Sequence, residues 1–459
     1  MLYVRTCILK TSIKTIGLLA ALAMGLTSSL SPMQAAEHFW DEIPPSPSTT
    51  MPSVVLDDYW NSEFQRVNRE VAAAQNTRLV FFGDSITWSW SLGPATGRAL
   101  WENQFADYKP INMGNSGDIT PVMLHRVTRG NLDFPDGRHP KVAVLLCGIN
   151  NFGVTQSAGG KEKWELGADC PPEDIANGQR AIAQVFRRKL PQTRVIMMAL
   201  LPVADHAKWK ICQEVNAIQA AVTRDSTEVA FIDLQDRFLL ADGSINKSLF
   251  TDGLHLSAEG YQAWAKGIAS KIDEFMKAPP LNPAKIMVIG GVATEGLDST
   301  GSYRCYLDGM LRRKGHHIDF IGSRHKHNGD KTEADSHQFD PDHEGHSGKN
   351  FAWFAENMPR LLEPNTPDIA VLQPGHDDIA ENITAVITAL RAKNPEVKIV
   401  LAEPNRTTNR FAKSPVVVAK IGLDLETRVP SADEARKVAT ILAEAILPLL
   451  PLKKTSSTP

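Results

Sequence analysis

The chain predicts an α/β protein made of two tandem domains, each a parallel sheet between helices. Short apolar runs alternate with amphipathic stretches, which is the pattern of parallel strands joined by crossover helices. The alternation stops at a proline-dense segment, residues 277–284, and then begins again. At 459 residues the chain also exceeds one ordinary core, since domains average about 150 residues.

The first 36 residues predict a secretory signal peptide. Basic residues precede an apolar stretch, residues 16–26, that is too short to span a bilayer comfortably. Ala35-Ala36 is the expected cleavage region, although the residues before it fit the small-residue rule poorly, so an uncleaved anchor stays an alternative. No later stretch is long and apolar enough for a transmembrane helix. We therefore expect a secreted or periplasmic protein without stable membrane insertion after cleavage.

The first domain is predicted over residues 54–277, after an extended lead-in at 37–53 that is rich in Pro, Ser and Thr. A helix at 56–75, with apolar and aromatic residues at helical spacing, leads into a strand at 78–83. The other predicted strands lie at 110–113, 142–147, 194–200 and 229–232, and the other predicted helices at 122–128, 172–190, 207–225 and 257–276.

The second domain is predicted over residues 285–450. Its expected strands lie at 285–289, 318–321, 369–373 and 397–401, and its expected helices at 303–313 and 431–447. Residues 451–459 form a polar tail that we expect to be disordered.

Composition and net charge indicate which kinds of binding partner to expect. The apolar fraction of 42% and the charged fraction of 22% are those of a soluble globular protein, and a net charge of -3 argues against nucleic acid as a partner. Cys7 leaves with the signal peptide, and the four remaining cysteines are too sparse for a disulfide scaffold. Cys147 is expected in the core, and a Cys170–Cys212 bridge is conceivable.

A serine follows the first strand of the first domain, in the run Gly83-Asp84-Ser85. Open α/β sheets bind ligands at the carboxyl ends of their strands, so a hydroxyl delivered there lies in the ligand-binding crevice. A serine hydroxyl becomes a good nucleophile only where a base takes its proton and donors receive the oxyanion. Ser85 is therefore the candidate nucleophile, and an ordinary strand-ending turn is the alternative.

Three later strand ends supply the groups that Ser85 needs. Gly117 lies in a glycine-rich turn whose backbone N–H groups can approach a bound oxygen, and the amide of Asn150 can donate to an oxyanion. Asp252 and His255 are three residues apart before a helix, so one short turn can present both to the same crevice. Taken singly, each residue has another explanation: a turn residue for Gly117 or Asn150, a helix N-cap for Asp252, and a half-buried polar residue for His255.

Together the four blocks resemble the SGNH, or GDSL-type, esterase superfamily. The matching runs are Gly83-Asp84-Ser85, Asn112-Met-Gly-Asn-Ser-Gly-Asp118, Gly148-Ile-Asn-Asn151 and Asp252-Gly-Leu-His255. The resemblance implies a flavodoxin-like domain in which Ser85 is the nucleophile, His255 the general base and Asp252 the carboxylate that orients the base. It also implies an oxyanion hole formed by the Ser85 and Gly117 N–H groups and the Asn150 side chain, with no metal or organic cofactor.

Within this superfamily the first domain is similar to the platelet-activating-factor acetylhydrolase catalytic subunits, through residues 117–120, 148–151 and Leu201-Pro202. The second domain is similar to a degenerate copy of the acetylxylan-esterase type, through residues 319–323 and 340–348. Gly291 and Val292 stand where a first block has Asp and Ser, Asp377 replaces the oxyanion Asn, and no Asp-x-x-His run remains before the last helix.

We therefore expect the second domain to be catalytically silent, and either to bind carbohydrate or to pack against the first domain. A His- and Asp-rich stretch at 325–346 could suggest a metal site. Its spacing is irregular and it lacks cysteine partners, so a solvated loop is the favoured interpretation.

The expected activity is hydrolysis of a short-chain acyl ester, acetyl in first place, on a carbohydrate by a secreted serine esterase. Export and the second domain favour the sugar, whereas the nucleophile blocks favour only an ester. A lipid-directed acetylhydrolase, lysophospholipase or thioesterase is the alternative enzyme, and a noncatalytic glycan-binding protein is the alternative of another class. Acyl chain length, the alcohol and the oligomeric state stay open.

Overall fold

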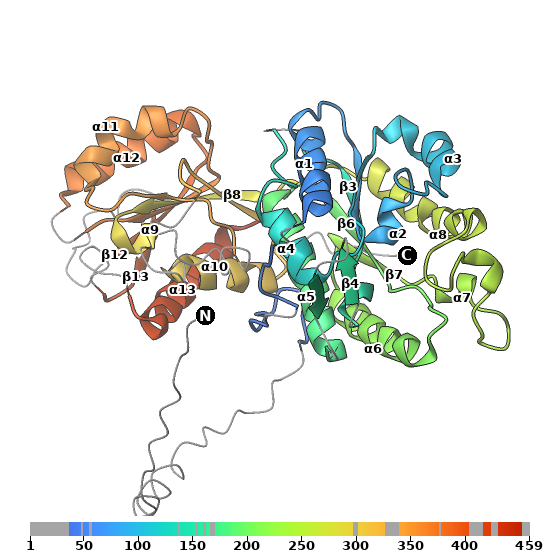
Figure 1. Cartoon of the computed structure of the whole chain (residues 1–459). Coiled ribbons are helices and arrows are strands. Elements are labelled where there is room, and N and C mark those ends of the chain that lie inside the picture. The colour runs from blue at the N-terminus through green and yellow to red at the C-terminus, as the bar shows by residue number, and fades with distance from the viewer. Residues whose placement is uncertain are drawn as a thin grey trace, which may run out of the picture. The chain divides into compact units, whose positions relative to one another are not determined.

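Two parallel sheets with helices on their faces make up the folded part of the chain (Figure 1). The computed structural model describes residues 36–46, 49–54, 57–135, 138–152, 155–158, 162–165, 170–296, 302–325, 339–375, 378–403, 416–423 and 430–451. The predicted signal peptide therefore lies outside the described residues except for Ala36, and the predicted tail except for Pro451.

The first sheet has the strand order β2-β1-β3-β6-β7, and all neighbouring strands run parallel. Its strands are β1 (Leu79–Gly83), β2 (Ile111–Gly114), β3 (Val142–Leu146), β6 (Arg194–Met198) and β7 (Val229–Ile232). Counted along the chain this order is 2-1-3-4-5, so β1 and β3 flank the point where the winding direction reverses. In such sheets the ligand crevice lies at the carboxyl ends of those two strands.

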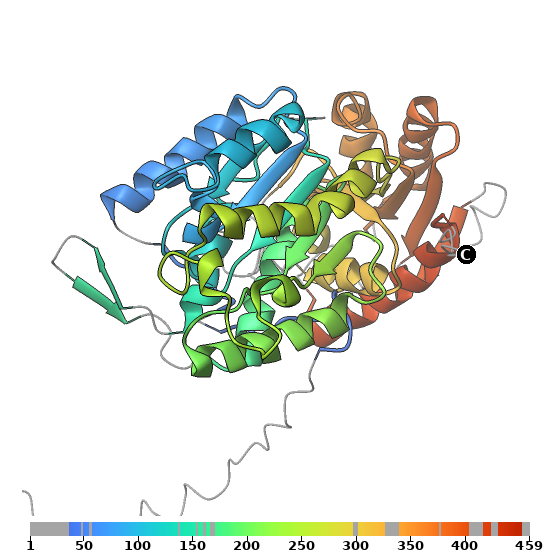
Figure 2. The same ribbon diagram turned by 90° about the vertical axis from the view of Figure 1, so that its right-hand side faces the viewer.

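Helices cover both faces of this sheet. α1 (Asp58–Ala72), α4 (Thr120–Thr128) and α5 (Pro172–Lys189) share a core with the side chains of Val80 and Phe82. α8 (Ala258–Lys277) shares the core of the opposite face with Leu79 and Phe81, and Figure 2 shows this helix lying across the sheet. With both faces covered, β1 is buried along its whole length, which explains its continuous apolar sequence.

α6 (His206–Thr223) shares the same core as α8. Shorter elements in the first half of the chain are α2 (Ser85–Trp88), α3 (Arg98–Leu100), α7 (Gln235–Phe238) and a hairpin of β4 (Thr155–Ala158) and β5 (Glu162–Glu165).

The second sheet repeats the same winding. β11 (Ile369–Gln373) pairs with one edge of β8 (Ala284–Gly290), and β9 (Ile318–Ile321) and β10 (Glu344–Gly345) pair with successive parts of β8. β12 (Lys398–Glu403) and β13 (Val416–Lys420) extend the sheet beyond β11. If β9 and β10 count as one interrupted strand, the order is again 2-1-3-4-5.

Among the described residues, four long helices cover the second sheet, two on each face. α10 (Ser302–Arg313) and α13 (Ala432–Ile446) share a core with Ile286 and Val288. α11 (Phe351–Leu361) and α12 (Ala380–Lys393) share the opposite core with Met287 and Ile289. A short helix, α9 (Val292–Glu295), follows β8 as α2 follows β1. The predicted fold class, two parallel sheets between helices, is confirmed.

The segment before α1 differs from its prediction. Residues 37–46 are not an extended lead-in, because Phe39 and Trp40 are buried in the core that contains α5. Arg180 of α5 donates to the carbonyls of His38 and Asp41 at 3.1 and 3.0 Å. The predicted limits of the two domains, 54–277 and 285–450, remain predictions, although folded structure clearly begins before residue 54.

Candidate active site

Ser85 begins α2, two residues after the end of the interior strand β1. Gly83 is required at the end of β1, since a Cβ there would lie 2.2 Å from the carbonyl oxygen of Leu146 and 2.3 Å from Thr87 Oγ1. Asp84 caps α2 by accepting a hydrogen bond from the Ile86 N–H at 3.0 Å. This sharp strand-to-helix turn holds the Ser85 side chain at the carboxyl edge of the sheet.

His255 and Asp252 meet Ser85 at this edge. Ser85 Oγ lies 2.9 Å from His255 Nε2, and His255 Nδ1 lies 2.7 Å from Asp252 Oδ2. The other carboxylate oxygen of Asp252 accepts the backbone N–H groups of Leu254 and His255 at 3.0 and 2.7 Å. The turn therefore fixes the carboxylate, and the carboxylate fixes the imidazole.

Asp252 is not the N-cap of α8. α8 is capped by Ser257, whose Oγ accepts from the Gly260 N–H at 3.2 Å. Burial raises the pKa of Asp252, but the hydrogen bonds from the His255 ring and backbone outweigh it and hold the pKa below the usual value. Asp252 is consequently ionised at neutral pH, as a carboxylate that stabilises an imidazolium must be.

Gly117 and Asn150 follow the two strands that flank β1. Gly83 pairs with Gly114 of β2 and with Leu146 of β3, so the two loops leave the sheet on either side of Ser85. Gly117 has a φ of +81°, a conformation that favours glycine. Asn150 Nδ2 donates to the carbonyl of Asp118 at 3.0 Å, which ties the β3 loop to the β2 loop.

The side chains that fix the β2 loop could not be identified from short-range patterns in the sequence. The carboxylate of Asp118 is fully buried, pairs with Arg126 of α4 and accepts from Trp60 Nε1 at 2.8 Å. Arg126 also donates to the carbonyl of Met113. In the sequence Asp118 is one residue of a glycine-rich block, and its partners Trp60 and Arg126 lie within predicted helices. Together they fix the backbone that carries the Gly117 N–H.

Asp84 is a second buried carboxyl close to Ser85. Burial, together with the negative charge of Asp118, raises the pKa of Asp84 to about 7, although the Ile86 N–H opposes the shift. Its Oδ2 atom is buried without a hydrogen-bond partner among the described residues. A carboxyl group in this state is partly protonated at neutral pH, which the sequence did not suggest.

The second sheet carries a different residue at the position of Ser85. Gly290 of β8 pairs with Gly345 of β10 and with Gln373 of β11, as Gly83 pairs with Gly114 and Leu146. Two residues beyond these glycines lie Ser85 in the first copy and Val292 in the second. The structure thus places an aliphatic side chain where the first copy has its hydroxyl.

Backbone features of the site are retained in the second copy. Gly348 has a φ of +71°, three residues past Gly345, as Gly117 lies three past Gly114. Asp378 accepts the N–H of Phe351 at 2.7 Å, and Asn151 accepts the N–H of Thr120 at 3.1 Å in the first copy. Asp377, expected at the position of Asn150, lies outside the described residues.

The predicted solvated loop of the second domain is wrong where it is described. His343, Glu344 and Asp340 are buried. Glu344 accepts from the Ser323 N–H and hydroxyl at 2.8 and 2.7 Å, and Asp340 accepts from the Phe320 N–H at 3.1 Å. These acidic side chains are structural polar groups. No group of three or more His, Cys, Asp or Glu side chains within the described ranges is placed to hold a metal ion.

The cysteine side chains of the first half of the chain that the structure describes are buried. Cys147 and Cys212 are buried, and burial raises the pKa of both thiols, to about 12 for Cys212. Cys212 is a thiol, so the conceivable Cys170–Cys212 bridge is not formed. None of the helices that the structure describes is long and apolar enough to cross a bilayer.

Comparison with known proteins finds a matching family and curated relatives for the first half of the chain. Residues 81–263 match the GDSL-like Lipase/Acylhydrolase family. Platelet-activating factor acetylhydrolase IB subunit alpha1 of Homo sapiens is 27% identical over 252 residues, 53% of this chain and 98% of the relative. The alpha2 subunit of Bos taurus is 25% identical over 226 residues, 49% of this chain and 88% of the relative.

Solved structures of low identity and low TM-score are also similar to parts of this chain. A family 3 carbohydrate esterase of Clostridium thermocellum covers 37% of this chain and 97% of its own, at 24% identity and a TM-score of 0.32. A GDSL-like lipase of Bacteroides thetaiotaomicron covers 47% and 99%, at 20% identity and a TM-score of 0.35. By the family match and the curated relatives, residues 81–263 are those of a GDSL/SGNH-type carboxylic ester hydrolase.

Proposed function

We propose that this protein is an exported serine esterase that removes acetyl groups from a carbohydrate. The observation that carries the proposal is the hydrogen-bonded series Ser85 Oγ, His255 Nε2 and Nδ1, and Asp252 Oδ2, with distances of 2.9 and 2.7 Å. These distances are those of a nucleophile, a base and the group that orients the base. The carboxyl edge beside β3 is where a ligand is expected in this sheet.

In the proposed mechanism Ser85 Oγ attacks the ester carbonyl carbon while His255 Nε2 takes the hydroxyl proton. The oxyanion receives the N–H groups of Ser85 and Gly117 and one N–H of Asn150, whose other amide proton is held by the Asp118 carbonyl. The alcohol leaves with the proton from His255. Water, deprotonated by the same imidazole, then attacks the acyl-enzyme and regenerates Ser85. Every proton has a named carrier, so the mechanism needs no cofactor.

Two features support the acetyl group and the sugar. The curated relatives are named acetylhydrolases, and they are matched over nearly their whole length. The N-terminal signal-like segment favours an exported enzyme, which meets extracellular polysaccharide, and the second domain resembles an acetylxylan-esterase-type copy. Cell fractionation followed by N-terminal sequencing tests the export part of the proposal. A protein that stays in the cytoplasm with Met1 in place contradicts it.

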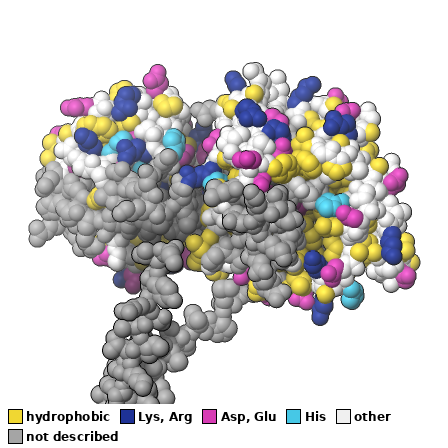
Figure 3. Space-filling model, in the orientation of Figure 1, with side chains coloured by type: hydrophobic (Ala, Val, Ile, Leu, Met, Phe, Trp, Pro, Cys, Tyr) yellow, Lys and Arg dark blue, Asp and Glu magenta, His cyan; other side chains and the backbone are white. Residues whose placement is uncertain are grey.

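A lipid-directed acetylhydrolase is the second candidate. The same relatives are named for platelet-activating factor, which favours a lipid alcohol. Hydrophobic side chains also gather on the visible face of the first half of the chain in Figure 3. Exposed apolar surface of this kind marks contact with an apolar ligand, a membrane or another protein. The two candidates share the acyl group and differ in the alcohol.

Acetate release separates the candidates. The wild type and Ser85→Ala are incubated with acetylated xylan, with acetylated phospholipid vesicles, and with p-nitrophenyl esters from acetyl to octanoyl. The proposal expects acetate from xylan with the wild type, none with Ser85→Ala, and a preference for acetyl over octanoyl esters. Faster release from the phospholipid than from any glycan supports the second candidate, and a preference for octanoyl esters overturns the acetyl assignment.

A further inference from the structure

Two fully buried polar side chains beside Ser85, those of Asp84 and Asn115, carry atoms that no described residue pairs with. Asp84 uses its Oδ1 atom to cap α2, but its Oδ2 atom has no hydrogen-bond partner among the described residues. The same holds for both the oxygen and the nitrogen of the Asn115 amide. Buried polar atoms are nearly always paired, either within the protein or with ordered water. Three such atoms at one edge of the active site therefore indicate a shared partner.

The two side chains are neighbours at the carboxyl ends of β1 and β2. Gly83 pairs with Gly114, and the Asn115 N–H donates to the Gly83 carbonyl at 3.0 Å, so the parallel ladder continues past both glycines. Asp84 follows Gly83 with an extended backbone, at φ -91° and ψ -152°. Neighbouring strands lie about 4.8 Å apart, and residues side by side on them point to the same face. The Asp84 carboxyl and the Asn115 amide therefore begin close together and project to the same side of the sheet.

This pair stands between the two backbone donors of the proposed oxyanion hole. Asp84 precedes Ser85, whose N–H is one donor, and Asn115 lies two residues before Gly117, whose N–H is the other. An oxyanion hole depends on donors that are held in place before the reaction begins. A link between the Asp84 and Asn115 side chains would fix the spacing of these two N–H groups.

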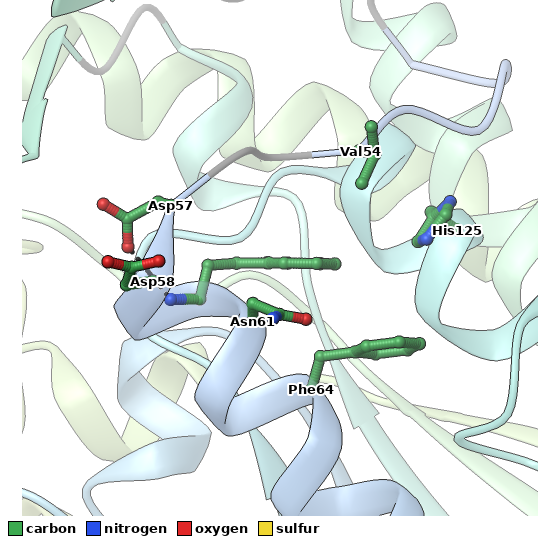
Figure 4. A pocket seen from close by; sticks show the side chains of 7 residues that line it. Val54, Asp57, Asp58, Asn61, Phe64 and His125 are labelled. Atoms are coloured by element: carbon green, nitrogen blue, oxygen red, sulfur yellow. Dashed lines mark hydrogen bonds between the residues drawn. The ribbon is translucent and has the colours of Figure 1, made fainter.

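The neighbouring buried acid already has its partners. The Asp118 carboxylate is used by Arg126 and by Trp60 Nε1. The cavity of about 390 Å³ at the start of α1, which Trp60 helps to line, does not reach the pair, because neither Asp84 nor Asn115 belongs to its lining (Figure 4). A single water molecule is small enough for a buried place of this kind, and it can bond to several polar groups at once.

The second sheet makes the same backbone turn. His346 donates its N–H to the Gly290 carbonyl at 2.8 Å, which is the bond that Asn115 makes in the first sheet. Gly291 follows Gly290 as the N-cap of α9, with φ -88° and ψ -138°, close to the angles of Asp84.

The polar pair itself does not occur in that second turn. Gly291 has no side chain, and the His346 Nε2 atom lies 2.5 Å from a carboxylate oxygen of Glu344. The turn therefore forms without a carboxyl and an amide at these two places. Since the copy that lacks the nucleophile also lacks the pair, Asp84 and Asn115 serve the chemistry of the first copy and not its backbone turn.

We propose that the Asp84 carboxyl and the Asn115 amide hold one water molecule between them and thereby position the Ser85 and Gly117 N–H groups for the oxyanion. A neutral carboxyl donates its O–H, and an amide both donates and accepts, so the two groups complement a water molecule. Burial raises the pKa of Asp84 to about 7, which keeps part of the carboxyl neutral at neutral pH. The inference rests on the proposed roles of Ser85 and Gly117, but not on the identity of the alcohol.

Hydrolysis of p-nitrophenyl acetate tests these positioning residues. Asn115→Leu keeps the side-chain volume and removes both polar atoms, whereas Asp84→Ser keeps an N-cap for α2 but no longer reaches toward Asn115. Each variant is expected to lower kcat by about 10-fold or more and to change KM by less than about 3-fold, because the donors bind the oxyanion in the transition state. Asp84→Asn keeps the cap and a polar group toward the water, so its kcat should exceed that of Asp84→Ser by about 3-fold or more.

Gln184→Met is the matched control. Gln184 is a buried amide of α5, and its partners, the Phe39 carbonyl and Arg188, lie outside the candidate active site. Its replacement should lower the urea midpoint and leave kcat unchanged. Urea unfolding of every variant shows whether kcat is measured on folded protein, and if Asn115→Leu does not fold, Asp84→Ser decides the test.

Each outcome bears on the inference. Loss of kcat in the folded variants, with recovery in Asp84→Asn, supports it. A loss of kcat smaller than about 10-fold in either folded variant overturns it, and so does an equal loss in Gln184→Met. A crystal structure of the wild type should show one ordered water bonded to both side chains, whereas a direct bond between them, or no ordered water, overturns the bridge. Full activity of Ser85→Ala in the same assay contradicts the proposed function, whereas an inactive Ser85→Ala beside an unaffected Asn115→Leu overturns only this inference.

Discussion

Asn150→Ala tests the proposed oxyanion hole most directly. Asn150 stands at the carboxyl edge beside Ser85, and its amide is oriented by the hydrogen bond to the Asp118 carbonyl at 3.0 Å. Alanine removes the amide donor from the developing oxyanion but leaves the Ser85, His255 and Asp252 side chains in place. The variant should therefore bind the ester and fail in the chemical step.

Asn150→Ala removes two interactions, one that affects kcat and one that affects the free energy of unfolding. One oxyanion donor is worth about 100- to 1,000-fold in kcat, or about 2.7–4 kcal/mol of transition-state stabilisation. The hydrogen bond to Asp118 is an ordinary one, so its loss should lower the free energy of unfolding by only about 1 kcal/mol. Activity should accordingly fall by orders of magnitude in a protein that is still folded.

The neighbouring amide provides the control. Asn151 is fully buried, accepts from the Thr120 N–H at 3.1 Å and donates to Thr120 Oγ1 at 3.0 Å, so it holds the start of α4. Asn151→Ala should lower the free energy of unfolding by about 2 kcal/mol or more, because buried partners lose their bonds. It should lower the kcat of the folded enzyme far less than Asn150→Ala does.

The assay is p-nitrophenyl acetate hydrolysis at saturating substrate, with urea unfolding of the same samples. A kcat for Asn150→Ala within 10-fold of the wild type refutes the reasoning. The reverse pattern refutes it too: if Asn151→Ala loses the activity and Asn150→Ala only the stability, then the donor is misassigned.

Three further predictions concern the same edge of the sheet. Asp252→Asn should lower kcat by about 10,000-fold at neutral pH, because an amide facing Nδ1 favours the wrong imidazole tautomer; a loss below 100-fold contradicts the orienting role of Asp252. A fluorophosphonate should label one serine per chain and none in Ser85→Ala, as measured by intact mass, whereas label on the variant would place a nucleophile elsewhere. Burial raises the pKa of Asp84 to about 7 in the folded state, against about 4 in the unfolded state. Between about pH 4 and about pH 7, therefore, the folded protein keeps the Asp84 proton and the unfolded protein has released it. The free energy of unfolding should therefore fall as pH rises from about 4 to about 7, by up to about 4 kcal/mol, and Asp84→Asn, which keeps the cap, should remove this fall. If the urea midpoints of the wild type and Asp84→Asn depend on pH in the same way, then Asp84 is not the group responsible for the loss of stability.

The sequence predicted the parts of the candidate site that depend on local spacing. Ser85 follows a strand that is apolar throughout, and Asp252 and His255 are close enough to share one turn, so their positions could be inferred from short stretches. The contacts behind the site could not be inferred. Asp118, Trp60 and Arg126 are brought together by the packing of α1 and α4 against β2, and no short-range pattern reports that packing.

In the fold, too, elements with a local sequence signal could be predicted, and elements that depend on packing could not. Strands buried on both faces, such as β1 and β11, were predicted to within a residue, because they are uninterrupted apolar runs. α11 and α12 were missed. α11 contains Pro359 in its interior, and α12 contains β-branched residues that do not favour a helix intrinsically, so both helices depend on their packing against Met287 and Ile289. The edge strand β13 is partly exposed, which makes its apolar run ambiguous.

The two copies differ in a way that separates folding from chemistry. A Cβ on Gly114 would meet the backbone of α2 at 2.2 Å, and a Cβ on Gly345 would meet the backbone of α9 at 2.4 Å, so both copies have glycine where the neighbouring strand approaches the short helix closely. Gly117 and Gly348 likewise share a positive φ. By contrast, Val292 stands where the first copy has Ser85, and in the sequence a valine precedes the N-cap Ser431 by two residues, as His255 precedes the N-cap Ser257. The second copy therefore retains the glycines that its backbone conformation requires, but it lacks the side chains that transfer a proton. Val292→Ser in the Ser85→Ala background should consequently give no esterase activity.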